Sequence, residues 1–211
     1  RQMCMMDRLD GVVERAARVP VQLAPGFADE RLCLRAKLGD RQVCGAFKAR
    51  GGWNNVAQLS PEERERGVVT CSSGNHGRAL AWAAERAGVE ATIVMPRDAY
   101  PNKIDACREL GARVVLSRDR LGADEDAAQL AAEGLVFIHP YDRAGTVEGA
   151  GTVGLELLQD WPEVELVLVP VGGGGLVAGV SLCLKRSLGE GVKVVGVEPV
   201  GAPSMQRGLA A

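Results

Sequence analysis

Residues 67–96 read GVVTCSSGNHGRALAWAAERAGVEATIVMP, and this stretch decides the fold class. The apolar run 67–71 predicts a strand, residues 75–87 have helical spacing, and the apolar run 91–95 predicts a second strand. A strand, a helix and a strand in this order are typical of a right-handed crossover between parallel strands. The stretch therefore predicts a parallel sheet with helices packed against it.

The same alternation continues on both sides of this unit. Ser60, followed by Pro61 and two glutamates, predicts a helix start, and Gly88, Gly111 and Gly134 stand where helices should end. Further strands are expected at 31–38, 113–116, 135–139, 165–171 and 193–197, and further helices at 46–59, 101–110, 123–133, 149–159 and 176–188. The sequence therefore predicts an α/β fold, a parallel sheet with helices on both faces.

Composition narrows the function classes. The 211 residues are 46% hydrophobic and 25% charged, and 25 Lys+Arg against 27 Asp+Glu leave a net charge of −2. This balance predicts neither a nucleic-acid partner nor an anionic membrane surface. The uncharged run 166–184 contains Pro170 and four glycines, which favours a strand, a turn and a helix over a membrane span. The N-terminus lacks the apolar core of a signal peptide, so we expect a cytoplasmic protein.

The cysteines and histidines give little support for a metal site. Six cysteines stand at irregular separations without a C-x-x-C pair, and the chain has only two histidines. We therefore expect reduced thiols and no structural zinc site.

A run of four glycines, Gly172–Gly175, stands between a predicted strand and a predicted helix. Backbone N–H groups at a helix N-terminus favour an anion, so the run predicts a phosphate site. An alternative is a dinucleotide loop, since Gly173, Gly175 and Ala178 fit G-x-G-x-x-A and Glu198 lies about twenty residues further on.

The turn SSGNHG, residues 72–77, places hydroxyl, amide and N–H groups at the start of a helix. It suits a carboxylate or the oxygens of a ring, and its alternative is helix capping by Ser72 or Ser73. His76 is a base, a stacking group or a packed core residue, and we favour a supporting role because no carboxylate lies near it in sequence.

Lys48 follows Phe47 in a small, apolar context. Burial of a lysine lowers its pKa toward the neutral amine that Schiff-base chemistry requires. The alternative is an exposed lysine on a helix, and Lys48 taken without its context would favour that alternative. The neighbouring motifs favour a buried, reactive lysine instead.

Five segments together resemble one family. They are GAFKARGG (45–52), SSGNHGRALA (72–81), HPYDRAGTVEGAGTVGLELL (139–158), VPVGGGGLVAGV (169–180) and VGVEPVGAPSM (195–205). In this order they resemble the pyridoxal-phosphate enzymes of the serine/threonine dehydratase and serine racemase group, the fold-type II class that also contains the tryptophan synthase beta chain. The resemblance runs from about residue 12 to the C-terminus.

The resemblance implies a role for each motif. Lys48 would bind the cofactor aldehyde beside Phe47, Asn75 would hydrogen-bond the ring hydroxyl, and Gly172, Gly173, Gly174 and Gly175 would hold the phosphate. Ser72, Ser73 and His76 would lie at the substrate, with Ser73 as the opposite-face base of a racemase. A divalent cation would use Glu198, although Ser204 stands where the second carboxylate is expected, so the ligand set is short.

The implied function is a dehydratase (ammonia-lyase) that converts serine or threonine into a 2-oxo acid and ammonia. The alternatives are an amino-acid racemase, an NAD-dependent oxidoreductase using the glycine run, and a non-catalytic cofactor-binding remnant. The resemblance further implies a small domain over 67–139, a large domain from 1–66 and 140–211, and a homodimer. Family members continue beyond Ala211 with the partner of the pyridine nitrogen, so we expect a C-terminally incomplete copy.

Overall fold

A parallel sheet forms one end of the molecule. The computed structural model describes residues 21–23 and 34–210. Four strands pair in the order β5-β4-β3-β6, all parallel. Their bounds are Val68–Cys71 for β3, Ala91–Pro96 for β4, Arg113–Ser117 for β5 and Val136–Phe137 for β6. This pairing confirms the α/β class and the parallel crossovers.

Helices cover both faces of this sheet. Helices α4 (Asn75–Ala87) and α5 (Pro101–Glu109) pack on one face, and α6 (Arg120–Ala132) packs on the other. Alternate strand residues supply the two cores: Ile93 and Met95 face α4 and α5, whereas Val69 and Val94 face α6. The near-continuous apolar strands of the sequence arise because both faces are buried.

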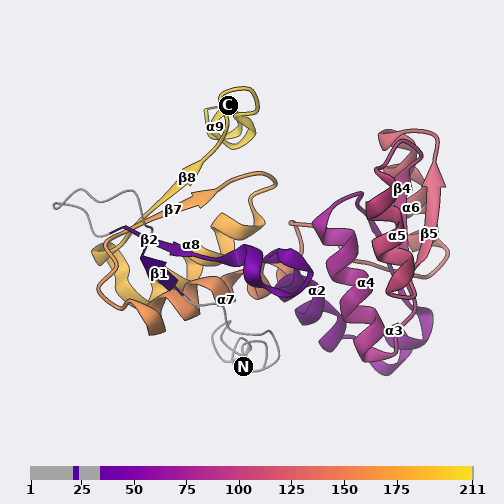
Figure 1. Cartoon of the computed structure of the whole chain (residues 1–211), viewed down its shortest axis with the longest axis horizontal. Coiled ribbons are helices and arrows are strands. Elements are labelled where there is room, and N and C mark those ends of the chain that lie inside the picture. The colour runs from indigo at the N-terminus through magenta and orange to yellow at the C-terminus, as the bar shows by residue number, and fades with distance from the viewer. Residues whose placement is uncertain (1–20, 24–33, 211) are drawn as a thin grey trace.

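The other end of the molecule contains β7 (Leu166–Pro170) and β8 (Lys193–Val197), which pair in parallel. Helices α7 (Ala144–Asp160) and α8 (Gly175–Leu188) pack against each other there, and Val169, Val180 and Leu184 form the local core. A short antiparallel pair, β1 (Val21–Leu23) and β2 (Arg35–Lys37), lies at the same end (Figure 1).

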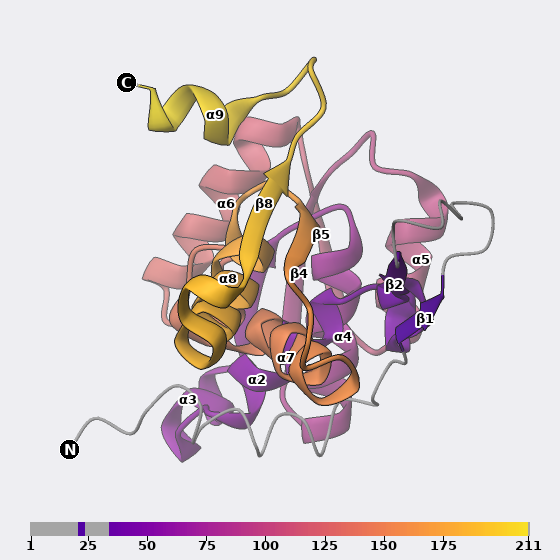
Figure 2. The same ribbon diagram turned by 90° about the vertical axis from the view of Figure 1, so that its left-hand side faces the viewer.

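Helix α2 (Lys48–Ala57) joins the two ends, because it packs on both α4 and α7. It follows two short 3-10 turns, η1 (Gly39–Arg41) and η2 (Val43–Gly45). The remaining elements are α3 (Pro61–Arg66), η3 (Gly189–Gly191) and α9 (Ser204–Leu209). Figure 1 and Figure 2 both show α9 beyond the end of β8.

Several local predictions are confirmed. Helix α3 starts with a capping box in which Ser60 accepts from the Glu63 N–H and Glu63 accepts from the Ser60 N–H. Gly88, Gly111 and Gly134 all have positive φ where helices end. Cys44, Cys71, Cys107 and Cys183 are free thiols, whereas Cys4 and Cys33 lie outside the described residues.

Other boundaries differ from the prediction. Helix α7 begins at Ala144, five residues before the expected start, because Asn54 on α2 donates to the Gly145 carbonyl and Asn55 donates to Thr146. Helix α6 begins at Arg120 because Asp119 accepts from the Gly122 N–H, a cap visible in the sequence. The strand expected at 31–38 is limited to Arg35–Lys37 among described residues, and it pairs antiparallel. Helix α9 was not predicted.

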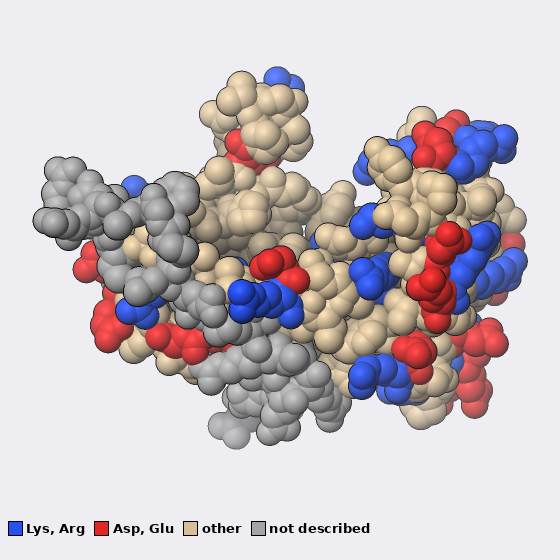
Figure 3. Space-filling view, in the orientation of Figure 1, with Lys and Arg blue, Asp and Glu red and all other residues tan. Residues whose placement is uncertain are grey.

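The surface carries mixed charge. Figure 3 shows basic and acidic side chains interspersed over the end that contains α3 to α6. Within residues 21–23 and 34–210, none of the helices combines the length and the apolar character needed to cross a membrane.

Candidate functional site

Lys48 is the first residue of α2, directly after a strained turn. Cys44 has φ 63 and Gly45 has φ 66, so the chain reverses sharply before Phe47. The half-buried Lys48 donates from Nζ to the Pro140 carbonyl at 2.6 Å, and its Nζ lies 5.2 Å from the centroid of the Phe47 ring. Burial lowers the pKa of Lys48, which favours the neutral, nucleophilic amine.

The Pro140 carbonyl belongs to a turn that follows β6. His139 organises this turn, because its Nδ1 accepts the N–H groups of Tyr141 at 3.3 Å and Asp142 at 2.8 Å. The His139 ring also packs edge-on against Tyr141, with centroids 4.5 Å apart. The turn therefore has a fixed shape where it meets the lysine.

The same turn lies against the glycine run. A Cβ on Gly173 would stand 2.2 Å from Tyr141 Cγ, and a Cβ on Gly175 would stand 2.7 Å from the Tyr141 carbonyl oxygen. Any side chain at these two positions would collide with Tyr141. One turn thus contacts both the Lys48 amine, through Pro140, and the glycine run, through Tyr141.

The glycine run leads into α8, as the sequence predicted. Gly174 is the N-cap residue with φ 87, and Gly175 is the first residue of the helix. No described atom lies within 4 Å of a Cβ built on Gly172. The first N–H groups of a 14-residue helix are free of intrahelical partners and favour an anion at this position.

The SSGNHG turn follows β3 and leads into α4. The N-cap of α4 is Gly74, so the alternative that Ser72 or Ser73 caps the helix is wrong. Ser72 Oγ instead accepts from the Gly74 N–H at 3.3 Å. Ser73 and Asn75 are exposed, in positions open to a ligand.

His76 lies behind this turn and is only 3% exposed. Its Nε2 lies 3.2 Å from the Ile138 carbonyl oxygen, whereas its buried Nδ1 has no hydrogen-bond partner among the described residues. Burial lowers the pKa of His76 to about 4, so the ring is neutral near pH 7. The ring is thus packed in the interior, in contact with Ile138, which lies between β6 and the Pro140 turn.

A cavity of about 470 Å³ lies next to this site, within the range of small-molecule pockets. Phe47 and Asn75 line it together with Pro170 and Leu176. Among its described lining residues neither Lys48 nor Gly172–Gly175 occurs, so the cavity adjoins the amine and the glycine run without containing them.

Glu198 has a role that the sequence did not reveal. Its two carboxylate oxygens accept the N–H groups of Met205 at 2.8 Å and Gln206 at 2.9 Å, so it holds the first turn of α9. Across the described part of the chain, no three His, Cys, Asp or Glu residues gather as metal ligands. The carboxylate is thus engaged with the backbone, which supports neither a cation site nor a contact to a dinucleotide ribose.

The Pro140–Tyr141 turn is the part of the site that sequence reasoning missed. Its residues lie in the HPYD segment, which directly follows a predicted strand, the place where ligands bind in parallel sheets. Its position after a strand was the one feature of the sequence that pointed to a functional turn. No local pattern, however, links it to a lysine 92 residues earlier in the chain.

Taken together, the fold and the site define an α/β protein in which a half-buried lysine amine and a helix N-terminus suited to an anion contact the same turn. The family model for pyridoxal-phosphate dependent enzymes matches residues 14–211, and the chain belongs to this family. The cofactor of the family fits the residues present, since Lys48 offers the amine for its aldehyde and Gly172–Gly175 offer N–H groups for its phosphate.

Known relatives agree with this assignment. The chain is 48% identical over 171 residues to an L-threonine ammonia-lyase of Thermotoga maritima, covering 80% of this chain and 42% of the relative. It superposes with a TM-score of 0.90 on the processed form of threonine deaminase isoform 2 from Solanum lycopersicum, at 37% identity, covering 98% of this chain and 59% of that one. Maize serine racemase gives a TM-score of 0.91 at 34% identity, covering 98% and 63%. The chain spans 32% to 52% of the length of the curated relatives it matches.

Proposed function

We propose that this chain carries the catalytic lysine of an ammonia-lyase that eliminates water from a β-hydroxy amino acid such as serine or threonine. Elimination of water leaves an enamine, and addition of water to the released enamine would give a 2-oxo acid and ammonia. The observation that carries this proposal is the Lys48 amine, held by the Pro140 carbonyl in the turn whose Tyr141 packs on the glycine run.

The chemistry that bound pyridoxal phosphate supplies is an electron sink for the electron pair left at Cα. Lys48 acts as the general base that takes the Cα proton, a role suited to a lysine whose pKa is lowered by burial. The N–H groups of Gly172–Gly175 would hold the phosphate, and the exposed Asn75 would hydrogen-bond the ring hydroxyl. Phe47 lies beside the amine.

Ser72 and Ser73 bind the substrate carboxylate in this proposal. Their hydroxyls and the neighbouring N–H groups stand at the carboxyl end of β3, next to the N-terminus of α4. His76 supports the turn from the interior, since its neutral ring contacts the Ile138 carbonyl. The lyase relatives favour elimination as the main reaction.

Racemisation is the second candidate. It is favoured by serine racemase relatives, including one from rice that is 39% identical over 172 residues, and by the exposed position of Ser73. A hydroxyl on the face of Cα opposite to Lys48 would return a proton with inverted configuration. A much larger loss of D-serine formation than of 2-oxo acid release in Ser73→Ala would assign that role, because the loss of a carboxylate contact alone would lower both rates together.

The decisive experiment is covalent trapping of the cofactor. Borohydride reduction of the chain with pyridoxal phosphate, followed by peptide mapping, distinguishes the five lysines. We expect the adduct on Lys48 and its loss in Lys48→Arg, together with loss of 2-oxo acid release from L-serine and L-threonine. An adduct spread over the other lysines would contradict the proposal, and trapping at Lys48 without turnover would indicate a non-catalytic cofactor-binding protein.

The domain division and the assembly belong to the same proposal. We place a small domain at 67–139 and a large domain at 1–66 and 140–211, in a cytoplasmic homodimer. The four-stranded sheet lies within the first range and the β7–β8 pair within the second. Light scattering after size-exclusion chromatography tests the dimer, and a monomer at micromolar concentration would contradict it.

A further inference from the structure

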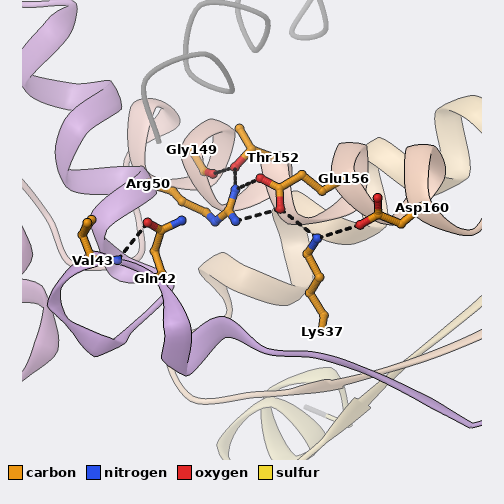
Figure 4. Close-up of polar contacts among 8 residues, drawn as sticks. All are labelled: Lys37, Gln42, Val43, Arg50, Gly149, Thr152, Glu156 and Asp160. Carbon is orange, nitrogen blue, oxygen red and sulfur yellow. Dashed lines mark hydrogen bonds and ion pairs between the residues drawn. The ribbon is translucent and has the colours of Figure 1, made fainter. Parts of the chain in front are cut away.

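Arg50, two residues after Lys48, forms a buried ion network with α7 (Figure 4). Its guanidinium donates to the two Glu156 oxygens at 2.5 and 2.9 Å and to Thr152 Oγ1 at 2.9 Å. Such a two-pronged contact fixes both the distance and the angle between the two groups. Arg50 therefore holds α2 on α7 in one orientation.

The network continues to β2. Lys37 Nζ lies 2.8 Å from Glu156 Oε2 and 3.2 Å from Asp160 Oδ2, which adds a second cation and a second carboxylate to the described part of the network. Arg50 is 1% exposed and Glu156 is fully buried. The hydrogen bonds of Arg50 and Lys37 outweigh burial and lower the pKa of Glu156, which therefore stays ionised near neutral pH.

Buried ion pairs contribute little net stability, because desolvation offsets their attraction. The contacts around Arg50 suggest what this pair does instead. A Cβ on Gly149 would lie 2.6 Å from the Arg50 carbonyl oxygen, and a Cβ on Gly52 would lie 2.8 Å from the Ala79 carbonyl oxygen. At these two points α2 meets α7 and α4 backbone to backbone, and further along α2 the side chains of Asn54 and Asn55 hydrogen-bond to α7. The contact of Arg50 with Glu156 therefore orients the first turn of α2, the turn that begins with Lys48.

The helix geometry connects this pair to the lysine. Residues two positions apart point about 200° apart around an α-helix. Because Arg50 points into α7, Lys48 must point away from α7, and there it meets the Pro140 carbonyl. Rotation of α2 by a fraction of a turn would remove the amine from this position.

We propose that Arg50 and Glu156 are positioning residues, whose ion pair fixes the rotation of α2 and thereby directs the Lys48 amine toward the Pro140–Tyr141 turn. The effect on cofactor attachment rests on the proposed function, whereas the effect on the position of Lys48 does not. Lys37, through its contacts with Glu156 and Asp160, ties β2 to the same carboxylate.

The test separates position from stability. In Arg50→Met the buried Glu156 carboxylate loses the two hydrogen bonds from the guanidinium, and we expect a lower unfolding temperature. In the double variant Arg50→Met/Glu156→Leu both charges are absent and Lys37 retains Asp160, so we expect most of the stability to return. If the ion pair served stability alone, the double variant would also regain the wild-type pKa and cofactor affinity of Lys48.

Two measurements report on Lys48 in the double variant. The first is the pH profile of acylation of its amine by a small reagent. In the wild type its midpoint should lie below that of the same lysine in the urea-denatured chain, and in the double variant it should move toward the denatured value. The second is the affinity for pyridoxal phosphate, which should fall roughly ten- to hundredfold, since small misplacements of reacting groups are costly.

Controls make the outcome decisive. The exposed pair Arg118 and Glu125, replaced in the same way, should change neither measurement. If the double variant fails to fold, Arg50→Lys replaces it, because lysine keeps the charge but not the two-pronged contact. Its acylation midpoint for Lys48 should shift in the same direction. A wild-type profile and affinity in a folded variant would overturn the positioning role. Absence of cofactor trapping on wild-type Lys48 would overturn the proposed function instead, and the acylation profile would still test the position.

Discussion

At the scale of single residues, His76 gives the protein a pH-dependent stability. Burial lowers its pKa to about 4, from an ordinary 6.5. Between these values the unfolded chain binds a proton that the folded chain does not, so stability falls as the pH falls through this range. The loss approaches about 3 kcal/mol. We expect His76→Gln, which retains an N–H donor, to show a smaller loss between about pH 7 and about pH 5 in urea unfolding.

Between about pH 7 and about pH 5 the titration of His76 is separated from that of Glu156. The pKa of Glu156 is lowered, so its contribution to stability is present above its ordinary value of 4.5 and is lost only at lower pH. An identical pH slope in the wild type and in His76→Gln would show that another group titrates in this range.

At the scale of the elements, the contact between α7 and α8 depends on Gly179. A Cβ at this position would lie 2.3 Å from the Val147 carbonyl oxygen and 2.6 Å from the Gly151 nitrogen, both backbone atoms of α7. The two helices would have to separate, so we expect Gly179→Ala to lower the free energy of unfolding by about 1–3 kcal/mol or more. Chemical denaturation measures this loss.

The matched control is Gly191→Ala. No described atom lies within 4 Å of a Cβ built on Gly191, and its φ lies outside the positive range. We expect this variant to unfold like the wild type. Equal stability of the two variants would mean that α7 and α8 separate without cost.

At the scale of the whole molecule, one face of the β7–β8 pair is exposed. Leu166, Leu168 and Val197 point to this face and are 52%, 58% and 49% exposed. Neighbouring exposed apolar side chains bind apolar ligands. We expect the 211-residue chain to bind a fluorescent hydrophobic dye, and Leu168→Lys to reduce the fluorescence while the far-ultraviolet circular dichroism stays unchanged.

The comparison variant is Leu121→Lys, at an exposed leucine on α6 at the other end of the molecule. It changes charge and hydrophobicity by the same amount away from the β7–β8 face. An equal reduction of dye fluorescence in both variants would contradict a localised apolar surface.

The sequence by itself determined the element order and most of the local structure. The expected bounds of α4 and β8 match the structure, because periodicity and terminal glycines are local signals. The glycine run before α8 was also recognisable, since four adjacent glycines have few other uses. Helix α9 was not, because Glu198 supplies its first hydrogen bonds from outside the helix.

Only the tertiary structure decided how the site is assembled. Lys48 hydrogen-bonds to Pro140, which lies 92 residues later in the sequence, and Arg50 hydrogen-bonds to Glu156, which lies 106 residues later. These contacts depend on where α2 lies between α4 and α7, and on glycines that let their backbones approach. A local pattern fixes which face of a helix is apolar, but the partner of that face, and hence the direction of the Lys48 amine, is set by the packing of the folded chain.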